Sequence, residues 1–410
     1  MPAVLLGGAL NSLSVARSLW RLGVPVDVFD EGLAESPVRH SRSRRRYHQL
    51  QPEQDVAEQW YSRLMENCEP SVILPCCDDG LELIARERVA LESVGHRPVE
   101  ANDEIVLALL DKAQTYELAR EVGIPAPRTM QLTDRADFDA VDETFFPCGT
   151  KPINSHVFSR RFRPFGKGTL LRTRQDLVRL VGPILDEGVP MLLTEMVEGT
   201  DECCSYYTYL EPDGTPLTHV TKRKLRQFPT RFGLGTYHLM KWDPEVAELG
   251  LRFFQGVGLR GLGNLEFKRD ARDGALKLIE SNPRFTHANE LVRIAGVDFG
   301  RLAYSRLAGM PLPPLDSFRD DIGLWFPVDD VRAFREYRRA GDLSTVTWIS
   351  TLLHRQCLPQ FDWADPGPSL SNGGRHAVRL ARRAIARLGS NDRRSARPDP
   401  DAIHEEFGSS

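Results

Sequence analysis

The amino-acid sequence predicts an α/β protein of more than one domain, with a parallel sheet near the N-terminus and antiparallel strands after it. Three observations lead to this prediction. Apolar strand-like runs alternate with helical spacing over the first hundred residues, and hairpin-like arms dominate from about residue 130. At 410 residues the chain is also too long for one ordinary compact core.

The first hundred residues are typical of a βαβ domain. The short apolar run "AVLLGG" is followed by helical spacing through Val15, Leu19 and Leu22, and then by "VPVDVFD". "SVILPC" and "GLELIARERVALES" repeat the strand and helix pattern, which predicts a parallel sheet over residues 1–100. The strongly helical "EIVLALLDKAQTYELAREVG" then leads into the next domain and ends at Gly123, before the breaker "IPAP".

The second domain is predicted at residues 101–312 and consists mainly of strands. "FFPCGTKPI" and "MLLTEMVEG" are strand-like, and "CCSYYTYLEPDGTPLTHVTKRK" has two β-rich arms joined by Pro-Asp-Gly-Thr. "EVAELGLRFFQGVG" is an amphipathic helix, and "GLGNLEFKRDARDGALKLIESNPRF" gives two more strands around an Arg-Asp-Gly turn. We expect a helical C-terminal extension at residues 313–390 and a disordered tail at 391–410.

Composition excludes several classes of protein. The formal net charge of −4 argues against a general nucleic-acid binder. No run approaches the roughly 18 apolar residues of a membrane span, so stable membrane insertion is not expected. The N-terminal apolar run lacks a basic segment before it, and the seven cysteines show neither zinc spacing nor a disulfide framework. These features predict a cytoplasmic protein with reduced cysteines.

Two carboxylates and an amide oxygen fall together on the last predicted hairpin. Glu266 lies on one arm, in "NLEFKRD", and Glu280 and Asn282 lie on the other, in "KLIESNPRF". Pairing of the arms about "ARDG" brings all three onto one face, since alternate strand positions share a face. Such hard oxygen ligands suit Mg²⁺, which keeps waters and phosphate oxygens in its shell. Glu266 and Glu280 as exposed strand residues is the alternative, but the apolar neighbours and Arg284 favour a metal site.

Further residues could contact a nucleotide. Lys112 opens a predicted helix, and Lys151 ends the strand in "PCGTKPI", which makes it a better phosphate-binding candidate than an isolated surface lysine. In "TEMVEGTDE" an extended backbone turns at Gly199, and its NH and CO groups could read an adenine edge. Glu202 could then accept ribose hydroxyls. An ordinary strand end and turn is the alternative for this stretch.

The ordered set "DK…GIPAPRT", "TKP", "EMVEGTDE", "LEFKRD" and "IESNPRF" resembles the ATP-grasp superfamily over about residues 1–310. The resemblance implies an ATP-grasp fold, with an N-terminal parallel-sheet domain, a small α+β lid subdomain at about 128–196 and a larger antiparallel-sheet subdomain. It also implies ATP and Mg²⁺ as cofactors, with Mn²⁺ able to substitute. Gly7, Gly8 and Asn11 would line a substrate pocket, although Asn11 as a helix cap is an equal alternative.

The resemblance assigns roles by position. Lys112 and Lys151 would contact the ATP phosphates, Glu195 and the backbone of Met196, Val197 and Glu198 would hold adenine, Glu202 would hold the ribose, Glu266, Glu280 and Asn282 would hold Mg²⁺, and Arg284 would face the reacting carboxylate or phosphate. The lid loop "SHVFSRRFRPFGKGTLLRT" is less glycine-rich than that of many relatives, and Lys167 would take the phosphate role there.

The segment "VTKRKLRQFPTRFGLGTYHLMKWDPEVAELG" resembles the central region of D-aspartate ligase and related carboxylate–amine ligases. There Arg223, Lys224 and Arg226 would supply positive charge toward an anionic substrate or the transferring phosphoryl group. Strand alternation puts Lys224 and Arg226 on one face. A solvated basic hairpin arm is the alternative.

The expected function is that of an ATP-dependent carboxylate–amine ligase, in which Lys151, Arg226 and Arg284 are catalytic. It would join small-molecule carboxylate and amine substrates, such as amino acids or peptides, through an acyl phosphate, and release ADP and phosphate. Three alternatives stay open: a carboxylase-type ATP-grasp enzyme, a nicotinamide-dependent oxidoreductase and a non-catalytic nucleotide-binding protein. The sequence does not define the oligomeric state, for which a homodimer is one option.

Overall fold

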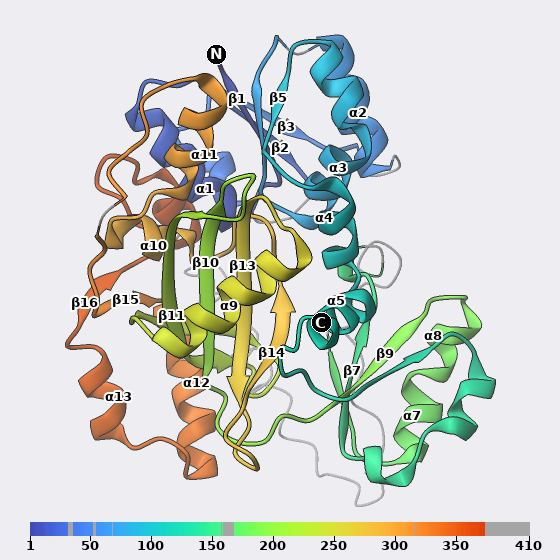
Figure 1. The fold of residues 1–410 in the computed structure, drawn as a ribbon. Coiled ribbons are helices and arrows are strands. Elements are labelled where there is room, and N and C mark those ends of the chain that lie inside the picture. The colour runs from blue at the N-terminus through green and yellow to red at the C-terminus, as the bar shows by residue number, and fades with distance from the viewer. Residues whose placement is uncertain are drawn as a thin grey trace, which may run out of the picture.

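The computed structural model describes residues 1–31, 36–51, 55–67, 69–156, 158, 168–315 and 317–373. These residues form three sheets with helices packed against them (Figure 1). The predicted α/β class is therefore confirmed. Lys167 and the tail at 391–410 lie outside the described residues.

The N-terminal domain contains a five-stranded parallel sheet in the order β3-β2-β1-β4-β5, as the βαβ pattern predicts. Its strands are β1 (Ala3–Leu6), β2 (Val26–Asp30), β3 (Arg46–Gln49), β4 (Val72–Pro75) and β5 (Arg97–Pro98), and its helices are α1 (Leu10–Arg21), α2 (Val56–Asn67) and α3 (Asp78–Ser93). Every residue of β1, β2 and β4 is buried, which agrees with continuous apolar runs in a parallel sheet covered on both faces.

A second, smaller unit contains a four-stranded sheet and lies apart from the rest in Figure 1. It consists of β6 (Thr129–Leu132), β7 (Cys148–Pro152), β8 (Thr169–Leu171) and β9 (Met191–Glu195), with α7 (Arg174–Leu180) and α8 (Gly182–Asp186). Its apolar core, which includes Leu132, Leu171 and Leu193, is separate from the other cores. We refer to residues 128–196 as the lid. The helices α4 (Asp103–Leu110) and α5 (Lys112–Glu121) connect it to the N-terminal domain.

The third unit contains a seven-stranded sheet in the order β14-β13-β10-β11-β12-β15-β16. The strands are β10 (Cys203–Leu210), β11 (Pro216–Phe228), β12 (Leu234–Met240), β13 (Gly261–Arg269), β14 (Leu276–Ser281), β15 (Ile322–Trp325) and β16 (Arg355–Cys357). The helix α9 (Pro244–Val257) covers one face, where Phe253 and Phe254 pack into the core with Tyr206 (Figure 1).

The segment after residue 312 is not purely helical, contrary to the sequence prediction. Its strands β15 and β16 extend the large sheet, while α12 (Pro327–Ala340) and α13 (Thr345–Thr351) follow β15. Each of these two strands has only three or four residues, so the sequence gives little periodicity from which to predict them.

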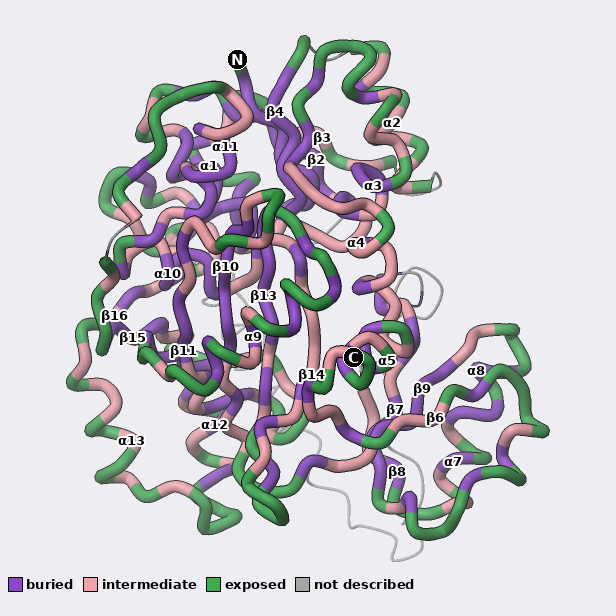
Figure 2. Tube along the Cα trace, viewed as in Figure 1, coloured by how far each residue is buried: buried purple, intermediate pink, exposed green. Residues whose placement is uncertain are grey.

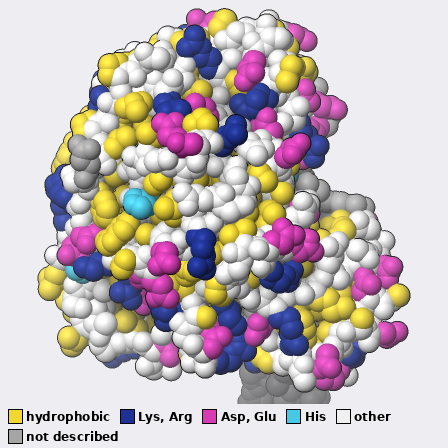
Figure 3. Space-filling model, in the orientation of Figure 1, with side chains coloured by type: hydrophobic (Ala, Val, Ile, Leu, Met, Phe, Trp, Pro, Cys, Tyr) yellow, Lys and Arg dark blue, Asp and Glu magenta, His cyan; other side chains and the backbone are white. Residues whose placement is uncertain are grey.

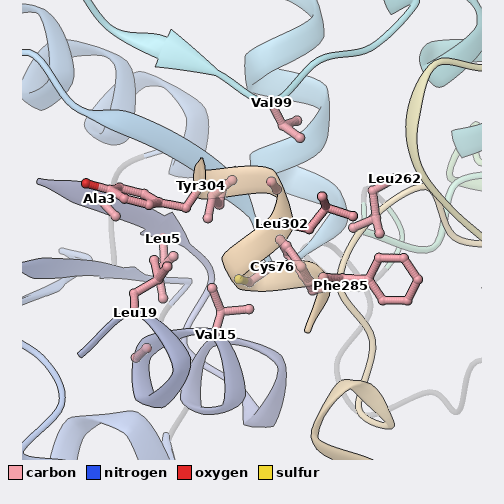
Figure 4. Packing of buried hydrophobic residues seen from close by; sticks show 14 of the residues in the cluster. Ala3, Leu5, Val15, Leu19, Cys76, Val99, Leu262, Phe285, Leu302 and Tyr304 are labelled. Carbon is pink, nitrogen blue, oxygen red and sulfur yellow. The ribbon is translucent and has the colours of Figure 1, made fainter. Parts of the chain in front are cut away.

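The N-terminal domain and the large sheet share one core, and Figure 2 shows continuous burial through both. Helices α10 (Asn289–Ala295) and α11 (Phe299–Ala308) lie between them. In Figure 4, Phe285 lies near Cys76, Leu262 and Leu302, which come from both units. These two units are therefore joined by apolar packing, whereas the lid has its own core and meets α5 in a small cluster of Tyr116, Ile153 and Leu192.

Residues 359–365, here named the closing segment, return to the N-terminal domain. Arg17 is fully buried, and its Nε donates to Asp365 at 2.8 Å. Its Nη2 donates to the carbonyl oxygen of Gln360 at 2.9 Å, and Ser41 Oγ donates to Asp365 at 2.6 Å. The closing segment thus supplies the counter-charge for a buried arginine of the first helix.

The surface charges and the cysteines agree with the composition of the chain. Across the described residues no helix is both long and apolar enough to cross a membrane. Basic and acidic side chains are interspersed on the face shown in Figure 3. The six cysteines within the described ranges form no disulfide.

Candidate active site

The two predicted carboxylates lie directly opposite each other on neighbouring strands. Glu266 of β13 pairs in register with Glu280 of β14, and a bulge follows between Glu266 and Phe267. Cross-strand partners of an antiparallel pair share a face. Beyond the end of β14, the backbone NH of Asn282 donates to the carbonyl oxygen of Asn264 at 2.7 Å. The hairpin therefore brings the three predicted metal ligands to one edge of the sheet.

This donor set fits Mg²⁺. Two opposed carboxylates and an amide oxygen provide hard ligands and leave coordination positions for water or phosphate oxygens. No cluster of three or more His, Cys, Asp or Glu side chains suited to a metal occurs in the described part of the chain. The third ligand at this site would be an amide, so an open site with few protein ligands is what these residues can form.

Three lysines lie close to the carboxylates. Lys224 Nζ is 3.2 Å from Glu266, and Lys112 Nζ donates to Ser155 Oγ at 2.7 Å. Burial opposes the charge on Lys224, but Glu266 outweighs it, so the pKa of Lys224 lies above its usual value. Burial likewise opposes the charge on Lys151, and Tyr116, Glu280 and Glu266 together raise its pKa. Lys224 and Lys151 are thus cationic at neutral pH.

A pocket adjoins the carboxylate of Glu280. It is lined by Asp78, Leu109, Leu110, Lys112, Thr115, Tyr116, Ile279, Glu280, Ser281 and Asn282. The helix α5 packs against β14 here, and the Tyr116 hydroxyl donates to the carbonyl oxygen of Ile279 at 2.7 Å. The pocket therefore draws its lining from the N-terminal domain, the α4–α5 connection and the end of the metal hairpin.

Arg284 lies next to the pocket and is paired with a residue that the sequence did not reveal. Its Nε donates to the Asp78 carboxylate at the start of α3, and its Nη1 donates to the carbonyl oxygen of Phe285 at 3.2 Å. Burial opposes the charge on Arg284, but Asp78 outweighs it and raises the arginine pKa. Asp78 is 206 positions away in the chain, so no local sequence pattern links the two.

The predicted adenine segment is partly occupied by contacts within the chain. Glu195 accepts hydrogen bonds from the backbone NH of Arg128 at 2.9 Å and from Arg272 Nη2 at 2.6 Å. The carbonyl oxygen of Met196 accepts from Arg272 at 3.3 Å, and that of Glu198 accepts from the NH of Ala271 at 3.2 Å. Adenine recognition by residues 196–198 stays a prediction. The carbonyl oxygens of Met196 and Glu198 already accept hydrogen bonds from within the chain.

Glu202, the predicted ribose ligand, forms an ion pair with Arg223. Val197 is buried. Asn11 does not cap α1, whose N-cap is Ala9. Its amide instead donates to the carbonyl oxygens of Cys76 at 2.8 Å and Phe285 at 3.0 Å, which joins the N-terminal sheet to the loop after β14.

The prediction that Lys224 and Arg226 share a face is wrong. A bulge interrupts the β11–β12 register between them, so Lys224 pairs with His238 and Arg226 pairs with the next residue, Tyr237. Adjacent strand residues point to opposite faces. Arg226 therefore points to the face opposite the carboxylates. There its Nε donates to the Asp330 carboxylate of α12 at 2.7 Å, and its Nη2 donates to the same carboxylate at 3.0 Å.

A buried lysine that was not predicted lies on the same face as the carboxylates. Lys222 is opposite Ser205, which in turn is opposite Glu266. Its Nζ donates to Ser205 Oγ at 3.0 Å and to His238 Nδ1 at 3.2 Å. Burial lowers the pKa of Lys222 to about 8. Strand alternation with Lys224 was the sequence signal that could have identified it.

Known proteins resemble this chain in sequence and in fold. No protein-family model matches the chain. D-aspartate ligase of Enterococcus faecium is 23% identical over 294 residues, which cover 68% of this chain and 69% of that protein. D-alanine–D-alanine ligase of Neisseria meningitidis is 26% identical over 183 residues, which cover 42% of this chain and 57%, less than two thirds, of that enzyme.

Two solved structures illustrate the shared fold. The biotin carboxylase domain of Hydrogenobacter thermophilus 2-oxoglutarate carboxylase, in complex with MgADP, has a TM-score of 0.59 and 19% identity, covering 78% of this chain and 73% of that chain. An L-amino acid ligase from Bacillus licheniformis has a TM-score of 0.57 and 15% identity, covering 78% of both chains. The chain therefore has the ATP-grasp fold, and its sequence is similar to a D-aspartate ligase and a D-alanine–D-alanine ligase.

Proposed function

We propose that this ATP-grasp ligase joins a small-molecule carboxylate to an amine through an acyl phosphate. The observation that carries the proposal is the opposition of Glu266 and Glu280, with Asn282 beside them and Lys151 and Lys224 nearby. Its sequence relatives include a D-aspartate ligase and a D-alanine–D-alanine ligase, and an L-amino acid ligase shares its fold. Amino acids are therefore the first substrates to test.

In this mechanism the side chains position groups and neutralise charge. Glu266, Glu280 and Asn282 would hold Mg²⁺, which supplies charge stabilisation at the phosphate oxygens when bound. Lys112 and Lys151 would contact the ATP phosphates. Lys112 lines the pocket together with Glu280, and Glu280 helps to raise the pKa of Lys151, so the two lysines would hold the terminal phosphates beside the predicted metal ligands.

The reaction would proceed in two transfers. A substrate carboxylate oxygen forms a bond to the γ-phosphorus of ATP, and the bond from that phosphorus to the bridging oxygen breaks, leaving ADP. The amine nitrogen then bonds to the acyl carbon, the carbon–oxygen bond to phosphate breaks, and the amine proton passes to solvent. Arg284 would stabilise negative charge on the phosphoryl group and on the oxyanion of the tetrahedral intermediate.

Oxygen labelling tests the proposed acyl phosphate. With an ¹⁸O-labelled carboxylate substrate, one labelled oxygen should appear in inorganic phosphate, because the carboxylate oxygen that attacked phosphorus leaves with it. The substrate would come from an ADP-release screen of D- and L-amino acids that begins with D-aspartate and D-alanine, each with a second amino acid as acceptor. Mass spectrometry of the phosphate is the measurement.

Two results would contradict this mechanism. Formation of AMP and pyrophosphate would indicate adenylation, and unlabelled phosphate alongside ADP would exclude attack by the carboxylate oxygen on phosphorus. Omission of ATP or chelation of Mg²⁺ is the control, and Mn²⁺ can be tested as a replacement.

We also propose a cytoplasmic location, because the proposed reaction uses ATP.

A carboxylase-type reaction is the second candidate, because a biotin carboxylase domain is among the proteins that share the fold. In that reaction bicarbonate would take the place of the substrate carboxylate. ADP release that depends on bicarbonate and not on an amino acid would favour the carboxylase reaction over the ligase reaction.

A further inference from the structure

The loop that carries Arg284 is held by the N-terminal domain. Asn11 donates to the carbonyl oxygens of Cys76 and Phe285, and the NH of Phe285 donates to the carbonyl oxygen of Pro75 at 3.4 Å. The ring of Phe285 is 1% exposed and lies in the core that both units share (Figure 4). The backbone on the C-terminal side of Arg284 is therefore fixed to the end of β4.

The guanidinium group of Arg284 is fixed from the same domain. Asp78 is the first residue of α3, and its carboxylate accepts from Arg284 Nε. The two side chains are 21% and 13% exposed, so water screens their interaction weakly. Asp78 also lines the pocket together with Lys112, Glu280 and Asn282, which places it beside the predicted metal and phosphate ligands.

The geometry of this pair leaves part of the arginine available. Nε is bonded to Asp78 and Nη1 to the carbonyl oxygen of Phe285. No hydrogen bond to Nη2 is found among the residues that the structure describes. A long side chain held at two nitrogens has already lost most of its rotamer freedom, so the remaining N–H groups are preorganised for an anionic group.

We infer that Asp78 is a positioning residue that holds Arg284 in the orientation required for the transfer step. The inference rests on the proposed function, because it assumes that Arg284 faces the phosphoryl group or the oxyanion. It makes the N-terminal domain a contributor to catalysis through a residue other than Gly7, Gly8 and Asn11, for which the sequence predicted a role in substrate binding. Asp78 itself need not touch the substrate.

Hydrogen–deuterium exchange tests the positioning without any substrate. In Asp78→Asn the amides of residues 284–288 should exchange faster than in the wild type, because the charged partner of Arg284 is lost. Glu92→Gln, on the exposed end of the same helix, is the matched control and should leave these amides unchanged. Exchange that is equal in wild type and Asp78→Asn would overturn the inference, whatever reaction the enzyme catalyses.

Turnover then tests whether the positioning serves catalysis. In ADP release with the amino-acid pair found by the screen, Asp78→Asn should lower kcat about 10- to 100-fold with KM for ATP nearly unchanged. Asp78→Glu, which keeps the charge, should recover part of the loss. In an Arg284→Ala background Asp78→Asn should cause no further decrease, because its effect acts through the arginine.

If Asp78→Asn lowers kcat by the same factor in the Arg284→Ala background as in the wild type, this role for Asp78 is refuted. If the wild type releases no ADP with any tested acid and amine, the proposed ligase function fails, while the exchange experiment still decides whether Asp78 fixes the loop. The two failures are therefore distinguishable.

Discussion

Glu280→Gln should remove nearly all ATP turnover while the fold stays intact. Glutamine keeps the size and a hydrogen-bonding oxygen, but one of the two opposed carboxylates loses its charge. Glu280 also contributes to the raised pKa of Lys151, so the substitution disturbs both the metal ligands and the neighbouring cation. We expect a decrease of about 10²- to 10³-fold in kcat, comparable with loss of one preorganised electrostatic contact at a reacting centre.

ADP release at saturating Mg²⁺ measures this effect, and circular dichroism checks the fold. Glu248→Gln on the exposed side of α9 is a suitable control, because that carboxylate belongs to the helix on the opposite face of the sheet. An unchanged rate for Glu280→Gln at saturating Mg²⁺ would show that Glu280 is not a metal ligand.

Arg226→Ala should mainly destabilise the protein. Arg226 is 3% exposed and forms two hydrogen bonds with the fully buried carboxylate of Asp330. Removal of one partner leaves a buried charge without its counter-ion, which costs about 3–5 kcal/mol. Thr236, Trp325 and Trp348 also donate to Asp330, but they are neutral and cannot replace the guanidinium group.

Native-state hydrogen exchange is the appropriate measurement, because it reports the local free energy of opening in a protein with several units. Amides of β11 and α12 should lose about 3–5 kcal/mol of protection. Arg223→Ala is the matched control. Its side chain is 42% exposed and pairs with Glu202, so we expect a change of about 1 kcal/mol or less. Full protection with lost turnover would instead support the catalytic role that the sequence suggested for Arg226.

The sequence was informative where structure depends on neighbouring residues. The Arg-Asp-Gly turn and alternation along the two arms predicted that Glu266 and Glu280 share one face, and the structure pairs them directly. The alternation of apolar runs and helices likewise predicted the parallel sheet of the first domain. Resemblance to the ATP-grasp superfamily then added the lid and the large sheet, which local patterns alone did not define.

The errors have specific physical causes. One extra residue at Leu225 reverses the direction of Arg226, and bulges have no clear signal in a strand of mixed composition. Asp330 lies 104 positions after Arg226, and Asp78 lies 206 positions before Arg284, so both pairings depend on how distant units pack. The cap alternative for Asn11 failed because α1 has its N-cap at Ala9, two positions before Asn11.

The closing segment has a consequence for how the chain is made. The ribosome synthesises Arg17 early and Asp365 late, and the buried guanidinium group gains its counter-charge when the two residues form their ion pair. During synthesis the surface that residues 359–365 later cover stays open to water. The nascent N-terminal domain therefore lacks these contacts for most of translation. A chain truncated before Asp365 would have a first domain without the counter-charge for Arg17.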